Sequence, residues 1–523
     1  MKPSANYNTE PWDVRRNRRS TAFLLKTTNM EYSNYQKLIF NFVKHSSANG
    51  VVEAVAGSGK TTTSIHAMKH VPNYMETLFA AFNKSIVEEL EQRVPAGVTV
   101  KTMHSLGWSA IRRHYGSDVQ LVERKSFSHA EKLLYKLKRE KWYWGYLHNI
   151  IKLTDIVRQN VEFDEDTVNE AMEKHAIAIL TGDEPEHVVK LIKSMTSDLD
   201  VFDFTDMIFF PAINPEIRLP KYDFVFIDEL QDLNRAQQVM IERMLNKKSR
   251  FIGVGDSRQA IYGFRGSDEQ SFQRFRDIPN TSGLPLSICY RCGKAIVEEA
   301  KLIVPHIEWY PRQVDGKVRT GYAEEIANGD WVICRNTKPL VVLAFLLISQ
   351  GKKARIKGKE IGENLINLLQ SVGVNIQSVA VRLLKAKRDQ LLTQYRDQYK
   401  MEKPELHPKV VSLEENIGVI EFLFDRLGGD VRRVIKFLQE TFSDDHADIS
   451  LSTIHKAKGL ENDRVFFLRP DLIPSRFAVN PWQKEQEENL RYVAITRAKK
   501  ELVYVNDFPF EQLSKQILNS DGY

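Results

Sequence analysis

One segment, VVEAVAGSGKTTTSIHAMKH at residues 51–70, limits the possible folds more than any other. Its apolar run Val51–Val55 predicts a buried strand, residues 57–59 contain two glycines that favour a tight turn, and a helix is expected to begin at Lys60. A strand, a glycine-rich turn and a helix in this order are typical of a Walker A loop, although Ala54 stands where that pattern usually has its first glycine. The sequence therefore predicts an α/β domain with a parallel sheet and a phosphate-binding loop.

The loop offers the groups that a nucleoside triphosphate needs. Its backbone N–H groups can converge on phosphate oxygens, and the N-terminus of the following helix adds a positive dipole. Lys60 is expected to reach the β- and γ-phosphates, and the Thr61 hydroxyl to complete a Mg²⁺ shell. The loop residues expected to bind ATP are Ala56, Gly57, Ser58, Gly59, Lys60, Thr61 and Thr62.

A second segment, YDFVFIDELQD, supplies the acidic half of such a site. Residues 224–227 read as a core strand, and Asp228 and Glu229 follow directly. Asp228 is expected to hold Mg²⁺, directly or through water, and Glu229 to orient and deprotonate the attacking water. Alone, this segment also fits a strand followed by an acidic turn. Together with the phosphate loop, it predicts ATP hydrolysis with Mg²⁺.

Six further segments accompany these two: AAFNKSIVEEL, TMHSLG, FIGVGDSRQAIYGFRGSD, LPLSICYRC, LSTIHKAKGLE and ENLRYVAITRAKK. In this order, from about residue 30 to residue 505, the chain resembles the UvrD/Rep/PcrA-like helicases of superfamily 1, subclass A. The resemblance implies two RecA-like parallel-sheet P-loop motor domains, each with a helical insertion, and ATP in the cleft between them.

The resemblance also assigns roles beside the γ-phosphate. Gln259 stands at the position of the γ-phosphate sensor, and Arg291 and Arg497 at those of two arginines from the second motor domain. Arginines that cross a cleft can stabilise the charge that develops during hydrolysis, and they make cleft closure depend on the nucleotide.

At the other end of the nucleotide, the resemblance implies that Gln36 reads adenine, Tyr290 stacks on it and Glu461 holds the ribose. Thr62 is a departure, because several relatives have an arginine there that covers the other adenine face. Gln36 is therefore expected to carry more of the selectivity for adenine.

For nucleic acid, the resemblance implies polar groups that follow phosphates and aromatic rings that stack on bases. The positions concerned are Phe82, Asn83, Thr102, His104, Tyr262, Phe264 and His455. Phe264 replaces the usual tryptophan. Core packing is the alternative for the aromatic residues.

The motif positions divide the chain. We expect a flexible basic arm at 1–26, the first motor domain at 27–107 and 199–282 with an insertion at 108–198, and the second at 283–357 and 441–523 with a reduced insertion at 358–440. In the first insertion, KLKREKWYWGY interleaves basic and aromatic residues, which suits either strand binding or an inward-packed aromatic face. The second insertion is short, so duplex-binding and autoinhibitory roles known from relatives are not carried over to it.

Charge and cysteine content add weaker constraints. The net charge of +6 is compatible with a polyanionic partner, and the three cysteines, Cys289, Cys292 and Cys334, favour a reducing compartment. The C-x-x-C pair could be half of a zinc site or a redox pair, but two small side chains near a strand end explain it more simply. Without a span-length apolar stretch or a signal-peptide core, a cytoplasmic, DNA-associated protein is expected.

The leading hypothesis is an ATP-dependent helicase or translocase that moves 3′ to 5′ on single-stranded DNA, including single-strand/duplex junctions, in replication, repair or recombination. Its polarity comes only from the resemblance. The alternative is a nucleic-acid-stimulated ATPase switch, a subunit of a repair or anti-phage complex that does not unwind by itself. Action on RNA is a third hypothesis.

Overall fold

A computed structural model describes residues 31–506, apart from 82, 141, 176, 178–180, 262–269, 374–376, 399–400, 402, 444 and 446. The expected N-terminal arm and three expected DNA contacts, Phe82, Tyr262 and Phe264, lie outside these described residues. No helix in the described part is long and apolar enough to cross a membrane.

The first sheet has six parallel strands in the order β3-β2-β6-β7-β1-β8. Their bounds are β1 Asn49–Ala54, β2 Thr77–Ala81, β3 Val98–Thr102, β6 Tyr222–Ile227, β7 Leu245–Gly255 and β8 Thr281–Leu286. Parallel strands need crossover connections, and these run through helices on both faces. Neighbouring residues therefore face different cores: Val52 packs with α1 (Asn34–His45) and α2 (Lys60–Met68), whereas Val51 packs with helices of the other face.

The first insertion is helical and adjoins the other face of this sheet. It contains α5 Lys125–Leu133, α6 Tyr143–Asn160, α7 Glu165–Lys174 and α8 Glu184–Thr196, and a short pair of strands, β4 Gln120–Leu121 and β5 Val201–Phe202, closes it. Two helices, α4 Met103–Tyr115 and α9 Asp206–Ile213, connect it to the sheet, beside α10 Arg235–Met244. In its aromatic segment, Tyr143 and Tyr146 are fully buried and Trp144 is 55% exposed. The inward-packed alternative therefore holds for the two tyrosines.

The second sheet also has six parallel strands, in the order β11-β16-β15-β12-β14-β13. Their bounds are β11 Lys317–Thr320, β12 Trp331–Cys334, β13 Ala354–Ile356, β14 Ile449–Thr453, β15 Asn462–Leu468 and β16 Ala498–Val505. One face packs against α12 Lys294–Lys301, α18 Ile454–Ala457 and α19 Pro481–Ile495. The other packs against α13 Thr337–Ser349 and the second insertion, α14 Lys359–Gln370, α15 Gln377–Thr393, α16 Pro408–Arg426 and α17 Val431–Thr441.

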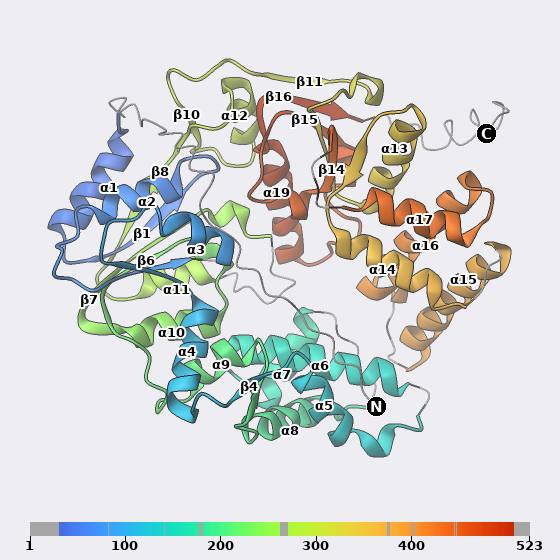
Figure 1. Ribbon diagram of the computed structural model, residues 1–523, viewed down its shortest axis with the longest axis horizontal. Helices are drawn as coiled ribbons and strands as arrows, with labels where there is room; N and C mark the ends of the chain where they lie inside the picture. Colours follow the sequence, from blue (N-terminus) through green and yellow to red (C-terminus); the bar gives the residue numbers. More distant parts are fainter. Residues whose placement is uncertain are drawn as a thin grey trace, which may run out of the picture.

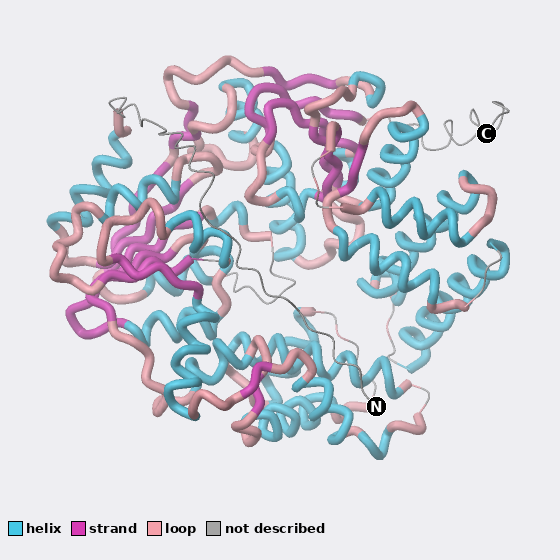
Figure 2. The backbone as a smooth tube through the Cα atoms, viewed as in Figure 1, coloured by secondary structure: helices cyan, strands magenta, loops and turns pink. Residues whose placement is uncertain are grey.

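The two sheets form separate groups of strands with helices around each (Figure 2). In Figure 1 the first sheet lies at the left, the first insertion at the bottom, the second sheet at the top and the second insertion at the right. The predicted fold class, two parallel-sheet domains with helical insertions, is confirmed.

Two predicted boundaries cut through elements. Strand β8 pairs with β1 from Thr281 to Leu286, so the first sheet continues past the expected boundary at 282/283. Helix α4 likewise runs across the boundary expected at 107/108. The sequence motifs show where functional residues stand. The ends of strands and helices depend instead on strand pairing and helical hydrogen bonds, which the motifs do not show.

Candidate nucleotide and nucleic-acid sites

The phosphate loop connects β1 to α2. Gly57 and Gly59 have φ values of 67° and 76°, a left-handed conformation that favours glycine. A Cβ atom on Gly57 would lie 2.5 Å from Arg291 Cβ, so a side chain there would also collide with a residue of the second motor domain. The Ser58 hydroxyl is buried and has no hydrogen-bond partner among the described residues. The loop thus keeps an unpaired polar group in a tight turn of the kind that binds phosphate.

Lys60 lies among three acidic residues at the ends of the neighbouring strands. Its Nζ is 3.2 Å from Glu229 Oε2. Burial opposes the charge on Lys60, but Glu229, Asp256 and Asp228 outweigh it, so the pKa of the ammonium group is raised. Glu229 has a left-handed backbone with φ 50°, a costly conformation for a residue with a side chain and one often found at functional sites.

The two acidic residues after β6 differ in their electrostatics. Burial and the charge of Glu229 raise the pKa of Asp228. Burial alone would raise the pKa of Glu229, but Lys60 and Lys458 lower it. Glu229 is thus the carboxylate that keeps its charge more easily, as a group that accepts a proton must.

The expected Mg²⁺ ligands are adjacent, since Thr61 Oγ1 donates to Asp228 Oδ2 at 3.2 Å. Hydroxyl and carboxylate oxygens suit Mg²⁺, which commonly takes only one or two protein carboxylates and completes its shell with phosphate and water. No group of three or more His, Cys, Asp or Glu that could hold a metal occurs in the described part of the chain, and this kind of site does not require one. The residues present therefore fit Mg²⁺ with ATP.

Residues of the second motor domain approach the loop. The N–H of Tyr290 donates to the Gly57 carbonyl at 2.9 Å, and Arg291 forms an ion pair with Glu461. Arg497 is 1% exposed, and its guanidinium donates to the carbonyls of Val493 and Leu460 and to the Thr496 hydroxyl.

Arg497 has no carboxylate partner among the described ion pairs. Burial, together with repulsion from Arg291, lowers the pKa of its guanidinium to about 10. A buried cation bound only to neutral acceptors is electrostatically under-compensated. It would therefore favour an anion that comes within reach.

The expected sensor and the adenine-side residues have protein partners. Gln259 Nε2 donates to Asp256 Oδ2 at 2.7 Å. Gln36 Nε2 donates to Thr63 Oγ1 at 3.1 Å, and its Oε1 accepts from the Tyr290 hydroxyl at 3.4 Å. Thr62 is half-buried. Gln36 and Tyr290 are thus brought together, whereas Glu461 is engaged by Arg291.

Two cross-domain contacts were missed by the sequence analysis. The Tyr492 hydroxyl, from α19, accepts a hydrogen bond from the Ala56 N–H at 2.8 Å. Lys458, which follows α18, contacts both carboxylate oxygens of Asp232 and the carbonyl of Gln259, each at 2.8 Å. Both residues lie inside the quoted motifs, but a sequence pattern gives no indication of the atoms they contact.

Of the expected nucleic-acid contacts that the structure describes, two residues cap helix N-termini and one takes part in an aromatic stack. Asn83 and Thr102 accept hydrogen bonds at the N-termini of α3 (Lys84–Leu90) and α4. The His104 ring stacks on Phe204, with centroids 4.1 Å apart and planes at 20°, and Phe204 is 60% exposed. Burial lowers the pKa of His104 to about 4, so the imidazole is neutral near pH 7. His455, in α18, is half-buried.

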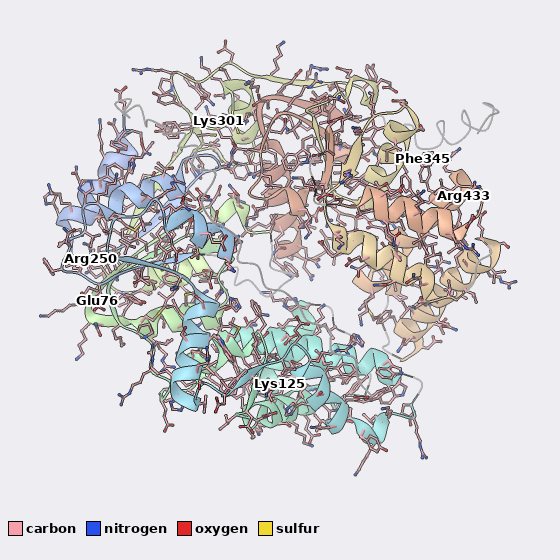
Figure 3. All side chains as sticks on the ribbon, in the orientation of Figure 1. Glu76, Lys125, Arg250, Lys301, Phe345 and Arg433 are labelled. Atoms are coloured by element: carbon pink, nitrogen blue, oxygen red, sulfur yellow. The ribbon has the colours of Figure 1, made fainter. Side chains whose placement is uncertain are left out.

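A buried ion network fixes the segment that carries Phe204. Arg158, from α6, donates to both Asp203 and Asp206 at 2.8–3.0 Å. Lys125, labelled in Figure 3, lies in the first insertion, and its Nζ is 2.9 Å from Asp206 Oδ2. All four side chains are at least nine-tenths buried. Because Phe204 lies between the two aspartates in the chain, the network holds its exposed ring in place. The sequence analysis did not single out Phe204.

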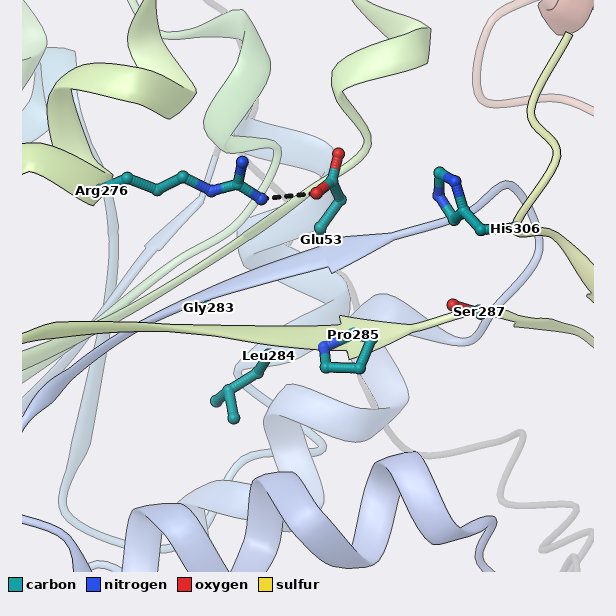
Figure 4. A pocket seen from close by; sticks show the side chains of 7 residues that line it. All are labelled: Glu53, Arg276, Gly283, Leu284, Pro285, Ser287 and His306. Atoms are coloured by element: carbon teal, nitrogen blue, oxygen red, sulfur yellow. Dashed lines mark hydrogen bonds and ion pairs between the residues drawn. The ribbon is translucent and has the colours of Figure 1, made fainter.

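A pocket of about 300 Å³ lies beside β1 and β8 but contains none of the expected site residues. Its lining, shown in Figure 4, comprises Glu53, Arg276, Gly283, Leu284, Pro285, Ser287 and His306. Arg276 pairs with Glu53 across it. The nucleotide site is therefore assigned from the loop geometry and not from this pocket.

The C-x-x-C pair is buried beside the phosphate loop. Cys289 and Cys292 are both fully buried, and the N–H of Cys292 donates to Cys289 Sγ at 3.4 Å. A Cβ on Gly57 would lie 3.1 Å from that sulfur. Close packing against the loop thus accounts for small side chains at these positions.

Two family models match the chain. One, described as the UvrD/REP helicase N-terminal domain, matches residues 36–279, and the other, described as the UvrD-like helicase C-terminal domain, matches residues 432–506. The first range ends just before β8, and the second begins in α17 and ends after β16.

The chain is also similar to curated helicases. It is 24% identical over 521 residues to F-box DNA helicase protein 1 of Schizosaccharomyces pombe, covering 87% of this chain and 55% of that protein. Over 291 residues it is 26% identical to ATP-dependent DNA helicase PcrA of Staphylococcus epidermidis, covering 49% of this chain and 38% of that protein. Over 283 residues it is 26% identical to ATP-dependent DNA helicase Rep of Escherichia coli, covering 49% of this chain and 42% of that protein.

The chain thus spans about half the length of the curated relatives it matches. Together the two matched domains cover more than half of the chain, and they include the phosphate loop, the acidic pair, Lys458, Tyr492 and Arg497. This chain belongs to the UvrD/Rep family of helicases.

Proposed function

We propose that this protein is an ATP-hydrolysing motor that moves 3′ to 5′ along single-stranded DNA and separates duplex strands. The observation that carries the proposal is the contact between the phosphate loop and α19, the helix that leads to Arg497: the Ala56 N–H donates to the Tyr492 hydroxyl at 2.8 Å. Arg497 itself is a buried guanidinium without a carboxylate partner among the described ion pairs. The relatives named as ATP-dependent DNA helicases support the choice of DNA.

In this proposal the loop and the acidic residues divide the work of hydrolysis. Lys60 leaves Glu229 to contact the β- and γ-phosphates, and Glu229, its charge favoured by Lys458, accepts a proton from the attacking water. Mg²⁺, held by Thr61 and Asp228, would neutralise charge on the phosphate oxygens. Gln259, now bound to Asp256, would turn toward the γ-phosphate.

Closure of the second motor domain would complete the site. Arg291 and Arg497 would approach the γ-phosphoryl and stabilise the charge that develops there. Tyr492 and Lys458 already bridge to Ala56, Asp232 and Gln259, so a change at the phosphates reaches α18 and α19 through direct hydrogen bonds. Alternate opening and closing of this contact would couple hydrolysis to movement.

DNA would run across the first motor domain at the Phe204–His104 stack. Stacking on an aromatic ring is tolerant of sequence, and a neutral histidine behind the ring supports it without a phosphate contact. Asn83, Thr102 and His455 would follow the DNA backbone. The aromatic residues Phe82, Tyr262 and Phe264, which lie outside the described residues, stay predicted as base-stacking positions.

Replacing Phe204 by alanine is expected to weaken single-strand binding by about 1–3 kcal/mol, the cost of one lost base stack. The affinity for a fluorescent oligothymidylate would be measured by anisotropy without nucleotide. Tyr74→Ala is the matched control, because Tyr74 is 82% exposed and stands outside the proposed path. Equal affinities of Phe204→Ala and wild type would remove Phe204 from the strand path.

A strand-separation assay tests the proposed activity. Wild-type protein with ATP and Mg²⁺ is offered duplexes with a 3′ or a 5′ single-stranded tail, and separation is expected from the 3′ tail. Separation only from the 5′ tail would overturn the polarity. Hydrolysis stimulated by single strands with no separation from either tail would reduce the function to an ATPase switch.

A further inference from the structure

A group of two lysines and two aromatic side chains lies near the contact between the two insertions. Lys409, from α16 of the second insertion, donates to Asn149 Oδ1 of α6 in the first insertion at 2.8 Å. Lys152 lies three residues after Asn149 on α6, so it shares the face of the helix that Lys409 approaches. His175, which caps α7, and Trp482 of α19 complete the group, with ring centroids 6.5 Å apart. We call these four side chains the Lys152–Lys409 cluster.

Among the described ion pairs, the two lysines of the cluster have no acidic partner. No ion pair of Lys152 or Lys409 occurs among the described residues, although many other lysines of the chain are paired. Both lysines are exposed to solvent, yet surrounding protein lowers the pKa of each ammonium group, and the charge of Lys152 lowers that of Lys409 further. Burial, with repulsion from Lys152 and Lys174, lowers the pKa of His175 to about 4.

This combination indicates an anionic ligand. Two like charges held close together at a partly desolvated surface raise the free energy of the unbound protein. An anion bound between them would offset this repulsion. A surface ion pair within the protein would have relieved the cost more simply, and the described residues do not provide one. Trp482 and the neutral His175 add flat aromatic rings beside the charges. Proteins that bind single strands combine basic and aromatic groups in this way.

Helix α6 connects the cluster to the segment that carries Phe204. Helix α6 carries Lys152 as well as Arg158, whose guanidinium fixes Asp203 and Asp206 on either side of Phe204. Six residues separate Lys152 from Arg158, which is about 9 Å along a helix axis. One helix therefore carries both Lys152 of the cluster and Arg158 of the ion network that holds the Phe204 segment.

We propose that the Lys152–Lys409 cluster binds the phosphate backbone of the single strand, so that the second insertion closes the DNA path against the first. The inference rests on the proposed action on single-stranded DNA and gives the short second insertion a role in it. Lys152 and Lys409 each contact one phosphate, and Trp482 flanks the strand. Because α19 also carries Tyr492 and leads to Arg497, the same helix would contact both DNA and the nucleotide site.

Salt dependence provides the test. Anisotropy titrations of a fluorescent oligothymidylate are run at several salt concentrations without nucleotide, for wild type, Lys152→Gln, Lys409→Gln and the double variant. Each phosphate contact on a single strand contributes about 0.7 to the slope of log affinity against log salt concentration. The double variant is therefore expected to lose about 1.4 from this slope, and each single variant about half of that.

The controls separate charge at the cluster from charge in general. Lys436→Gln removes one lysine from α17, where Lys436 is 74% exposed and 3.8 Å from Glu440, and is expected to leave the slope unchanged. Lys409→Arg keeps the charge and is expected to keep the slope. Since Lys152 has no hydrogen bond among the described contacts, Lys152→Gln reports on DNA binding even if Lys409→Gln disturbs the contact with Asn149.

A double variant with the wild-type slope would overturn the inference while leaving the motor proposal intact. The inference would also be overturned if the slope fell as much in Lys436→Gln as in Lys152→Gln or Lys409→Gln, because the loss would then reflect net charge alone. A change seen with duplex and not with the single strand would also overturn it. Failure of wild-type protein to bind the oligothymidylate would instead contradict the proposed function itself.

Discussion

Replacement of Arg497 by alanine is expected to slow ATP hydrolysis by about 10³- to 10⁵-fold, the range found when an arginine that reaches the γ-phosphoryl is absent. Binding of ATP is expected to stay within a few-fold of wild type, because the loop and Lys60 belong to the other motor domain. Turnover would be measured with saturating single strand, and binding with a fluorescent ATP analogue.

The physical reason lies in how Arg497 is held. Its guanidinium is fixed by two carbonyls and one hydroxyl, so it needs little reorganisation to meet developing charge. Its lowered pKa, about 10, still leaves it fully charged near pH 7. A full charge in a buried position without a carboxylate partner acts strongly on a nearby phosphoryl group.

Two further variants serve as controls for the loss of Arg497. Arg497→Lys keeps a charge but loses the planar set of donors, so it is expected to bind ATP and hydrolyse it slowly. Arg433→Ala, an exposed change on α17, is the matched control. If thermal unfolding shows Arg497→Ala to be folded and its turnover equals that of wild type, Arg497 does not act in hydrolysis.

Replacement of Lys60 by alanine is expected to abolish measurable hydrolysis, with a loss of at least about 10²-fold from the missing charge on the phosphates. Unlike Arg497→Ala, this variant should also bind ATP poorly. Lys60 is the cation that Glu229, Asp256 and Asp228 surround, so its removal leaves three acidic groups facing the incoming triphosphate. Repulsion then opposes binding before chemistry begins.

Lys69→Ala is the matched control for Lys60, since Lys69 caps the same helix, α2, and is exposed. Both variants would be compared by binding of the ATP analogue and by turnover. Lys60→Arg restores the charge with a larger head group and is expected to recover binding better than turnover. Unchanged ATP turnover in Lys60→Ala would contradict the assignment of the phosphate loop.

The nucleotide site could be predicted well because its chemistry is concentrated in short continuous segments. Gly57, Lys60, Asp228 and Glu229 each follow a strand whose apolar run is visible in the sequence, and the ends of parallel strands meet at one edge of a sheet. The structure brings these residues together as expected. The resemblance then supplied the arginines of the second sheet, which no local pattern would have paired with the loop.

Other features depend on packing between distant segments and were not predictable. The contact of Tyr492 with Ala56 joins residues more than four hundred positions apart, and a tyrosine in a helix motif reads as ordinary core. The exposed ring of Phe204 depends on the buried ion network that holds Asp203 and Asp206, and Arg158 of this network comes from a distant helix. The approach of Lys409 to α6 likewise exists only in the folded chain.

The partners found for Gln259 and Glu461 also lie beyond sequence reasoning. Both were assigned to the nucleotide by resemblance, and in the structure they bind Asp256 and Arg291 instead. Their roles toward ATP are therefore proposals that rest on the resemblance.

The central claim, that hydrolysis drives movement along a strand, is tested most directly by the ATPase rate on oligothymidylates of increasing length. At saturating DNA and ATP, a protein that translocates spends more of its time stepping on a longer strand. We expect the rate per molecule of wild-type protein to rise with strand length toward a plateau. A rate that is stimulated by DNA but independent of strand length, or not stimulated at all, would contradict a translocating motor.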